Sequence, residues 1–245
     1  VGVILEKIGI DNHIEFVNPK ISLITCTNRP DMLPNILRNF DRQLWDNKEL
    51  NIIIDCEKKR FKQIVQEIHG RKDVHVKLVK PGLSLGECFN LGIDQSNGDY
   101  IGKFDDDDLY GPQYLNDQML AFNYTNADIV GKLCSFMYHE KSNSTYLRFE
   151  KSRHRYSDLV LGPTFLFKRK VAEKVKMQNL SKGEDTNFLK DCIKAGFKIY
   201  STDPYNFVYV RKKVEGFHTW DATDDELLKN AQAMGNLPPE EYAFV

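Results

Sequence analysis

The sequence predicts an α/β fold with a mostly parallel, Rossmann-like central sheet, and two observations carry the prediction. In the first hundred residues, short β-rich apolar runs alternate with segments whose apolar residues recur at helical spacing. This alternation is typical of βαβ units, in which helices connect parallel strands. Polar residues also follow three of the runs directly, and ligands of open parallel sheets bind beyond the carboxyl ends of the strands.

Four strands separated by helices are expected in the first half. The strands are the apolar runs at residues 21–26, 50–54, 74–79 and 100–104. The helices are the periodic segments at residues 32–40, 61–68 and 84–95. The third helix opens with Ser84 and Glu87, which have the spacing of a capping box.

The second half lacks this regular alternation. Helices are expected at residues 112–125 and 185–195, and Thr223 with Glu226 has the pattern that caps a C-terminal helix. Shorter strand-like runs lie at residues 129–133, 136–139, 146–149, 165–167, 198–200 and 207–210. Because no internal repeat or low-complexity linker divides the chain, we expect residues 21–245 to form one domain with two faces.

Composition and charge exclude several classes of protein. The 245 residues carry a formal net charge of -1, which gives no overall field to attract nucleic acid or a membrane. No apolar run approaches the ~20 residues that a membrane span needs, and no signal peptide is visible. The five cysteines are widely spaced and form no Cys-x-x-Cys pair, which favours a reducing compartment over a disulfide framework or zinc site. We expect a cytoplasmic protein, free or peripheral to a membrane.

The chain begins with Val1 rather than Met, and residues 3–8 have the pattern of the last turns of a helix. This favours excision from a longer polypeptide over processing of a natural N-terminus. We expect residues 1–20 to be a helix and linker that belong to an upstream domain.

Four consecutive aspartates, Asp105 to Asp108, follow the expected strand at residues 100–104. Carboxylates this close resist ionisation beside one another, and a divalent cation removes that cost. Alternate residues of an extended segment point the same way, so we expect Asp105 and Asp107 to face one ion. Their oxygens suit Mn²⁺ or Mg²⁺. The alternative is a solvated acidic turn, with Asp108 capping the next helix.

Other acidic motifs fit this cluster poorly. A calcium-binding EF-hand loop that starts at Asp105 requires an oxygen ligand at its fifth position and Gly at its sixth, where Leu109 and Tyr110 stand. An aspartyl-phosphate phosphatase usually has Thr or Val at the fifth position of its motif, which these two residues also do not match. A Walker phosphate loop is absent from the sequence.

With the aspartates in place, the sequence resembles the family 2 glycosyltransferases from about Ile21 to Arg211. Residues 21–30, ISLITCTNRP, resemble the family's opening strand and turn. Residues 85–93, LGECFNLGI, and 97–108, NGDYIGKFDDDD, resemble the helix that leads into the metal-binding Asp-x-Asp. Residues 183–189, GEDTNFL, resemble the Glu-Asp motif that supplies the base. Each segment is a weak signal alone, and their order and spacing make the resemblance specific.

The resemblance implies a GT-A fold with a nucleotide-binding N-terminal half and an acceptor-binding C-terminal half. It also implies a nucleotide-diphosphate-sugar donor, a divalent metal and inversion at the anomeric carbon. In this chain Asp105 and Asp107 would hold the metal and the diphosphate. Asp185 would be the general base, and Glu184 would orient the base or the acceptor.

For the donor, the resemblance places Asp55 against the nucleotide base. The other residues that it places near the donor are Thr25, Asn28, Asn90 and Asp106. Two positions depart from the family pattern. Cys56 follows Asp55 where the family often has a second Asp, and Phe89 precedes Asn90 where it often has Arg.

His218, in the run GFHTW at residues 216–220, is a second-rank candidate for the metal. Some GT-A enzymes use a late His as a metal ligand or phosphate contact, and the alternative is a structural histidine.

We therefore expect an inverting transferase whose acceptor is a hydroxyl of a polysaccharide, glycolipid or glycan of the cell envelope, a class that rests on analogy. A carboxylate only accepts hydrogen bonds, so Asp55 favours uracil or thymine over cytosine, and the order is UDP, dTDP, GDP. One alternative is a sugar nucleotidyltransferase, whose Gly-rich signature near the first strand is absent. The other is a domain that has lost catalytic activity and binds glycan or a partner. The presence of Asp105, Asp107 and Asp185 argues against this alternative.

Overall fold

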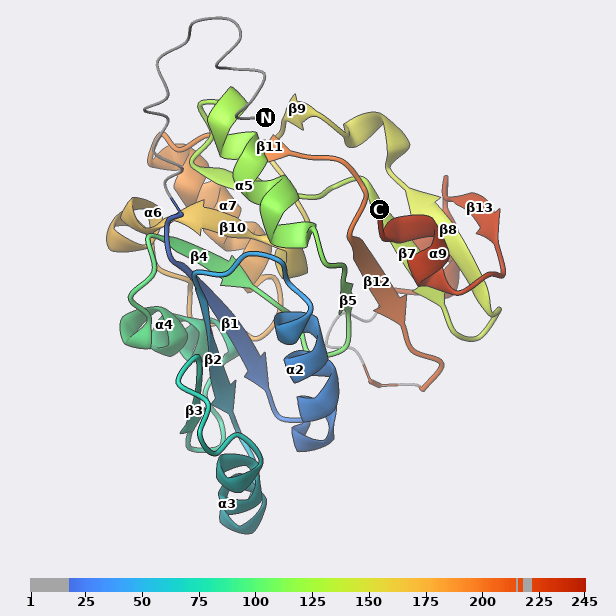
Figure 1. Ribbon diagram of the computed structural model, residues 1–245. Coiled ribbons are helices and arrows are strands. Elements are labelled where there is room, and N and C mark those ends of the chain that lie inside the picture. The colour runs from blue at the N-terminus through green and yellow to red at the C-terminus, as the bar shows by residue number, and fades with distance from the viewer. Residues whose placement is uncertain (1–17, 215, 218–221) are drawn as a thin grey trace, which may run out of the picture.

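In the described part of the chain, residues 18–214, 216–217 and 222–245, a computed structural model places eight strands in one large sheet (Figure 1). Their order is β3-β2-β1-β4-β10-β6-β11-β9. The strands are β1 (Ile21–Thr27), β2 (Lys48–Ile54), β3 (Val74–Leu78), β4 (Tyr100–Lys103), β6 (Ile129–Gly131), β9 (Arg155–Tyr156), β10 (Leu166–Lys168) and β11 (Ile199–Ser201). The strands β1 to β4 are parallel, whereas β10 is antiparallel to β4 and β6. The expected mostly parallel central sheet is confirmed.

Helices cover both faces of this sheet. Those packed on one face are α2 (Leu33–Asp41), α3 (Lys58–Glu67) and α5 (Tyr114–Tyr124). Those packed on the other face are α4 (Leu85–Gln95), α6 (Arg169–Lys174) and α7 (Glu184–Lys194). In β1, Leu23 packs on the first face and Ile24 on the second. A strand buried on both faces requires an apolar run of this kind, rather than alternation of apolar and polar residues.

The start of α4 follows the sequence prediction closely. Ser84 Oγ accepts a hydrogen bond from the Glu87 N–H at 3.1 Å, and the Glu87 carboxylate accepts one from the Ser84 N–H at 2.9 Å. This is the expected capping box. Further along the helix, Gly92 lies so close to Ile24 of β1 that a Cβ would overlap it. The helix therefore packs directly on the strand.

A second sheet of five described strands lies beside the first, in the order β13-β8-β7-β12-β5 (Figure 1). Its strands are β5 (Leu109–Tyr110), β7 (Ser135–His139), β8 (Ser144–Arg148), β12 (Phe207–Arg211) and β13 (Gln232–Gly235). The short helices α8 (Asp224–Leu228) and α9 (Pro239–Ala243) accompany it. The sequence patterns indicate β7, β8 and β12 but not their separation from the main sheet. The two-residue strand β5 pairs with β12 and links the four aspartates to this second sheet.

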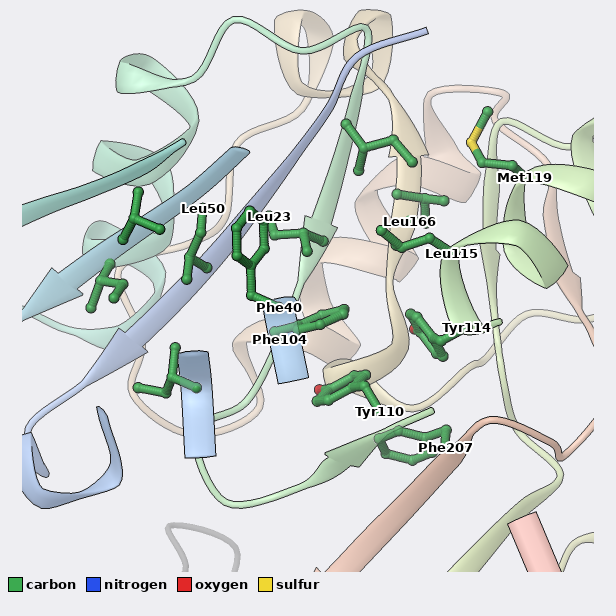
Figure 2. Packing of buried hydrophobic residues seen from close by; sticks show 14 of the residues in the cluster. Leu23, Phe40, Leu50, Phe104, Tyr110, Tyr114, Leu115, Met119, Leu166 and Phe207 are labelled. Carbon is green, nitrogen blue, oxygen red and sulfur yellow. The ribbon is translucent and has the colours of Figure 1, made fainter. Parts of the chain in front are cut away.

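An aromatic core anchors both ends of the aspartate segment. Phe104 and Tyr110 flank the segment, and their rings stack with centroids 3.7 Å apart. Tyr114 and Phe207 close around Tyr110 with centroid distances of 5.1 and 5.3 Å (Figure 2). Because the chain leaves this core at Phe104 and returns to it at Tyr110, the loop between them is held at both ends.

None of the described helices has the length and apolar character needed to cross a bilayer.

Candidate active site

The carboxyl ends of β1 and β4 bring a polar cluster together at one edge of the large sheet. The carboxylate of Asp106, in the loop after β4, accepts a short hydrogen bond from the Thr27 hydroxyl at the end of β1. Asp105, Asp107 and Asp108 each offer a carboxylate oxygen, and these atoms lie within 4.8 Å of one another. The structure therefore brings together Asp105 and Asp107 and adds Asp108 to them.

Asp108 does not have the capping role that the sequence left open for it. The helix α5 begins at Tyr114, with Gln113 at its N-cap. Instead, Asp108 is 1% exposed, and its Oδ1 accepts a hydrogen bond from the Val210 N–H at 2.9 Å. Its Oδ2 is buried and accepts no hydrogen bond from the described residues. A buried carboxylate oxygen of this kind is a fitting ligand for a cation.

The raised pKa values of the acidic cluster also favour a cation site. Burial raises the pKa of Asp107 to about 7, and the carboxylates of Asp106 and Asp105 add to this effect, whereas Arg29 opposes it. Burial also raises the pKa of Asp108, together with the charges of Asp107 and Asp105. Ionisation of these side chains is costly in the protein alone, and a divalent cation would remove that cost. The residues present thus fit Mn²⁺ or Mg²⁺.

Arg29 is held against the acidic loop by several contacts. Its guanidinium binds both carboxylate oxygens of Asp106 and lies 3.1 Å from Asp107 Oδ2. It also donates to the Phe217 carbonyl at 3.0 Å and stacks over that ring at 4.1 Å. Asp106 is 2% exposed, so a donor contact by its carboxylate would require this network to open.

Lys103, the last residue of β4, lies between two predicted site residues. Its ammonium is 2.9 Å from Asp185 Oδ2 and 3.3 Å from Asp105 Oδ1. Burial opposes this charge, but the carboxylates of Asp105, Asp185 and Glu184 outweigh it and raise the pKa of Lys103. Lys103 was not among the residues predicted from the sequence, although a lysine at the end of an apolar run was a usable signal.

Asp185 lies in the first turn of α7, one residue after Glu184. Burial raises the pKa of Asp185, an effect that Lys103 opposes and Asp105 reinforces. Burial and the charge of Asp185 raise the pKa of Glu184 as well. Gly183 precedes the helix with a φ of 76°, a left-handed conformation that suits glycine.

The donor residues predicted from the sequence differ in their surroundings. Thr25 is fully buried, two residues before the end of β1 that meets the acidic loop, and its expected place in a nucleotide pocket stays a prediction. Asn90 donates to the Met177 carbonyl at 2.8 Å and accepts from the Met177 N–H at 3.1 Å, so its amide ties α4 to the segment before α7. Asn28 is exposed after β1, and Asp55 is half-buried after β2.

Two further expectations fall outside the described residues, namely the metal contact of His218 and the helical residues 3–8.

An open hollow of about 870 Å³ lies at the edge formed by β9 and β11, where Arg155 and Lys198 line it. None of the predicted site residues lines it. The candidate site is therefore the acidic edge of the sheet rather than this hollow.

Known proteins of similar fold bind nucleotide sugars. A structure of S. aureus TarS residues 1–349 in complex with UDP-GlcNAc matches 86% of this chain and 64% of that chain, with a TM-score of 0.65 and 15% identity. A mannosyltransferase of Pyrobaculum calidifontis, PcManGT, in complex with GDP-Man and Mn²⁺ matches 81% of this chain and 58% of that chain, with a TM-score of 0.61 and 13% identity. The chain thus spans about three fifths of each of these two solved chains.

Identities this low show a shared fold only. No curated protein matches the chain. The model of the family described as "Glycosyl transferase family 2", however, matches residues 22–182, which is most of the chain and includes the acidic loop. The chain therefore belongs to glycosyl transferase family 2.

Proposed function

We propose that this chain is an inverting glycosyltransferase that moves a sugar from a nucleotide-diphosphate donor, with UDP ranked first, to a hydroxyl of a glycan, glycolipid or polymer. One observation carries the proposal. The Lys103 ammonium lies 3.3 Å from Asp105 Oδ1, in the acidic cluster, and 2.9 Å from Asp185 Oδ2. Sugar transfer from a diphosphate requires stabilisation of charge on the leaving oxygens and removal of a proton from the acceptor. Groups suited to both tasks are adjacent here.

The acidic cluster supplies the metal side of this proposal. Asp105 and Asp107, with Asp108 as an added ligand, would hold Mn²⁺ or Mg²⁺. A bound cation of this kind would stabilise the charge that develops on the diphosphate. The Mn²⁺ and GDP-Man bound to the mannosyltransferase of similar fold support this assignment, as does the UDP-GlcNAc bound to TarS.

Asp185 supplies the proton acceptor. Its carboxylate has a raised pKa, which makes it a better base than a solvated aspartate. One carboxylate is sufficient when the acceptor hydroxyl attacks the anomeric carbon directly, which inverts that centre. Glu184 is buried beside it and would orient either the base or the acceptor. The acceptor class rests on the family and on analogy.

The substitution Asp185→Asn tests the proposal, because an amide keeps the size of the side chain and cannot accept the proton. We expect turnover to fall by ~10²-fold or more, as for loss of a general base. Calorimetry with UDP-sugar and Mn²⁺ should give donor affinity near that of the unchanged protein. Asp191→Asn, a neutralisation elsewhere on α7, is the matched control and should leave both quantities unchanged.

Near-normal turnover in Asp185→Asn would contradict the proposal. The alternative of a domain without catalytic activity makes a different prediction, since the unchanged protein would then bind a UDP-sugar and Mn²⁺ but neither transfer nor hydrolyse the sugar.

A further inference from the structure

Lys103 is fixed at its backbone as well as at its ammonium. Its N–H donates to the Phe165 carbonyl at 2.9 Å, and the next N–H, of Phe104, donates to the Ile24 carbonyl at 3.0 Å. The residue is 4% exposed. Its ammonium is therefore delivered from a strand that neighbours hold on both sides, and it has little freedom to leave the two carboxylates.

Burial of a lysine side chain is unfavourable, because removing an ammonium from water is costly even when it is paired. An apolar residue would suit this buried position at the end of β4 better if stability alone mattered. Both anionic partners of Lys103, Asp105 and Asp185, belong to the candidate site. This pairing indicates that the charge serves the site rather than the fold.

The two carboxylate oxygens of Asp185 have different surroundings. Lys103 donates to Oδ2, and Gly162 packs against the same atom so closely that a Cβ there would overlap it. The neighbouring carbonyl of Pro163 accepts a hydrogen bond from the Tyr110 hydroxyl at 2.8 Å, which holds this turn in place. Oδ1 is buried and accepts no hydrogen bond from the residues that the structure describes.

We propose that Lys103 is a positioning residue that, through Oδ2, holds the Asp185 carboxylate in the orientation that receives the acceptor's proton. The inference rests on the proposed role of Asp185 as base. In the transfer step the acceptor O–H bond breaks and its proton passes to the Asp185 carboxylate. The acceptor oxygen forms a bond to the anomeric carbon, and the bond from that carbon to the diphosphate breaks, with the electron pair leaving on the diphosphate.

The substitution Lys103→Met removes the hydrogen bond while keeping an unbranched side chain in the strand. Misplacing a reacting group by about 1 Å can cost on the order of 100-fold in rate, so we expect turnover to fall about 10- to 100-fold. The KM for the donor and the Mn²⁺-dependent affinity for UDP should change less than about threefold. Lys103→Arg keeps a cationic donor and should recover much of the lost turnover. A residue that only stabilised the fold would not separate turnover from KM in this way.

A double-mutant cycle with Asp185→Asn locates the effect. If Lys103 acts through Asp185, Lys103→Met should have little further effect on the residual turnover of Asp185→Asn. Gly162→Ala, which displaces Oδ2 from the other side, should lower turnover in the unchanged background and not in Asp185→Asn. Lys132→Met is the matched control, because Lys132 is fully buried and pairs with Asp203 at 3.1 Å. It should lower the melting temperature without lowering the turnover of folded protein.

Three results would overturn the inference. They are turnover of Lys103→Met within twofold of the unchanged protein, an undiminished effect in the Asp185→Asn background, and a loss confined to Mn²⁺ or UDP affinity. If Asp185→Asn itself is fully active, the proposed function fails first. If Asp185→Asn is inactive and Lys103→Met is not, only the role of Lys103 fails.

Discussion

Buried carboxylates lie at both ends of β1, and their surroundings are opposite. Beside the start of β1, Glu49 of the neighbouring strand β2 is 3% exposed and accepts hydrogen bonds from the Ser22 hydroxyl at 2.6 Å and the Asn97 N–H at 3.0 Å. The Lys20 ammonium lies 2.5 Å from its carboxylate. Burial opposes its ionisation, yet these partners outweigh burial and lower the pKa of Glu49. Near the other end, burial and neighbouring carboxylates raise the pKa of Asp107 and of Asp108.

This difference distinguishes a carboxylate whose charge is balanced within the protein from carboxylates suited to binding a ligand. The Glu49 carboxylate has protein partners for its negative charge, so no ligand is needed to complete it. In the acidic loop, one carboxylate oxygen of Asp108 has no hydrogen-bond partner among the described residues. Shifts of pKa in this direction gather at functional sites. The same type of side chain therefore marks stability at one edge of the sheet and a candidate ligand site at the other.

The largest expected effect comes from replacing one carboxylate beside each end of β1 with an amide. Asp107→Asn should lower turnover by ~10²-fold or more, because it removes a ligand of the metal that stabilises developing charge. Glu49→Gln should lower the melting temperature and leave the turnover of folded protein unchanged. Kinetics with Mn²⁺ and thermal unfolding measure the two effects. Full activity of Asp107→Asn in the presence of a chelator would show that the acidic loop is not the metal site.

The pH dependence of unfolding sharpens the comparison. The pKa of Glu49 is lowered by folding, so its contribution is present above its unfolded value of about 4.3 and is lost as the pH falls below it. The pKa of Asp107 is raised to about 7, so in the metal-free protein its contribution is present below the unfolded value of about 3.9. It is lost as the pH rises from there through about 7.

Denaturant unfolding across pH 3 to 8 without metal measures both slopes. Asp107→Asn should flatten the decline between about pH 4 and 7, and Glu49→Gln should flatten the loss below about pH 4. Saturating Mn²⁺ should stabilise the protein increasingly as the pH rises, because the metal and the proton compete for Asp107. A stabilisation by Mn²⁺ that does not change with pH would separate the raised pKa from metal binding.

Spacing along the chain predicted the features that depend on residues close to one another in sequence. The four parallel strands, the capping box at Ser84 and the approach of Asp105 to Asp107 all follow from spacing along the chain. The contacts that shape the site come from distant parts of the chain. Lys103 meets Asp185 across 82 residues and Asp108 meets Val210 across 102, and no local pattern contains such pairs. Thr25 is fully buried because β1 continues for two more residues, and the nucleotide contact expected of it stays a prediction.

The smallest expected effect concerns Asp55, whose backbone N–H donates to the Thr27 carbonyl at 3.0 Å at the same edge of the sheet. A carboxylate beside the nucleotide base only accepts hydrogen bonds. Uracil and thymine offer it an N3–H, and guanine offers an N1–H and an amino group, whereas cytosine presents an acceptor at that position. An unpaired buried acceptor costs ~1–3 kcal/mol, so CDP should bind roughly tenfold or more weakly than UDP.

Calorimetry of UDP, dTDP, GDP and CDP in Mn²⁺ tests this preference, with affinity expected to fall in that order. Asp55→Asn is the sharper variant, because an amide can donate as well as accept and should bring CDP close to UDP without abolishing the binding of either. If CDP already binds the unchanged protein as tightly as UDP, Asp55 does not contact the base.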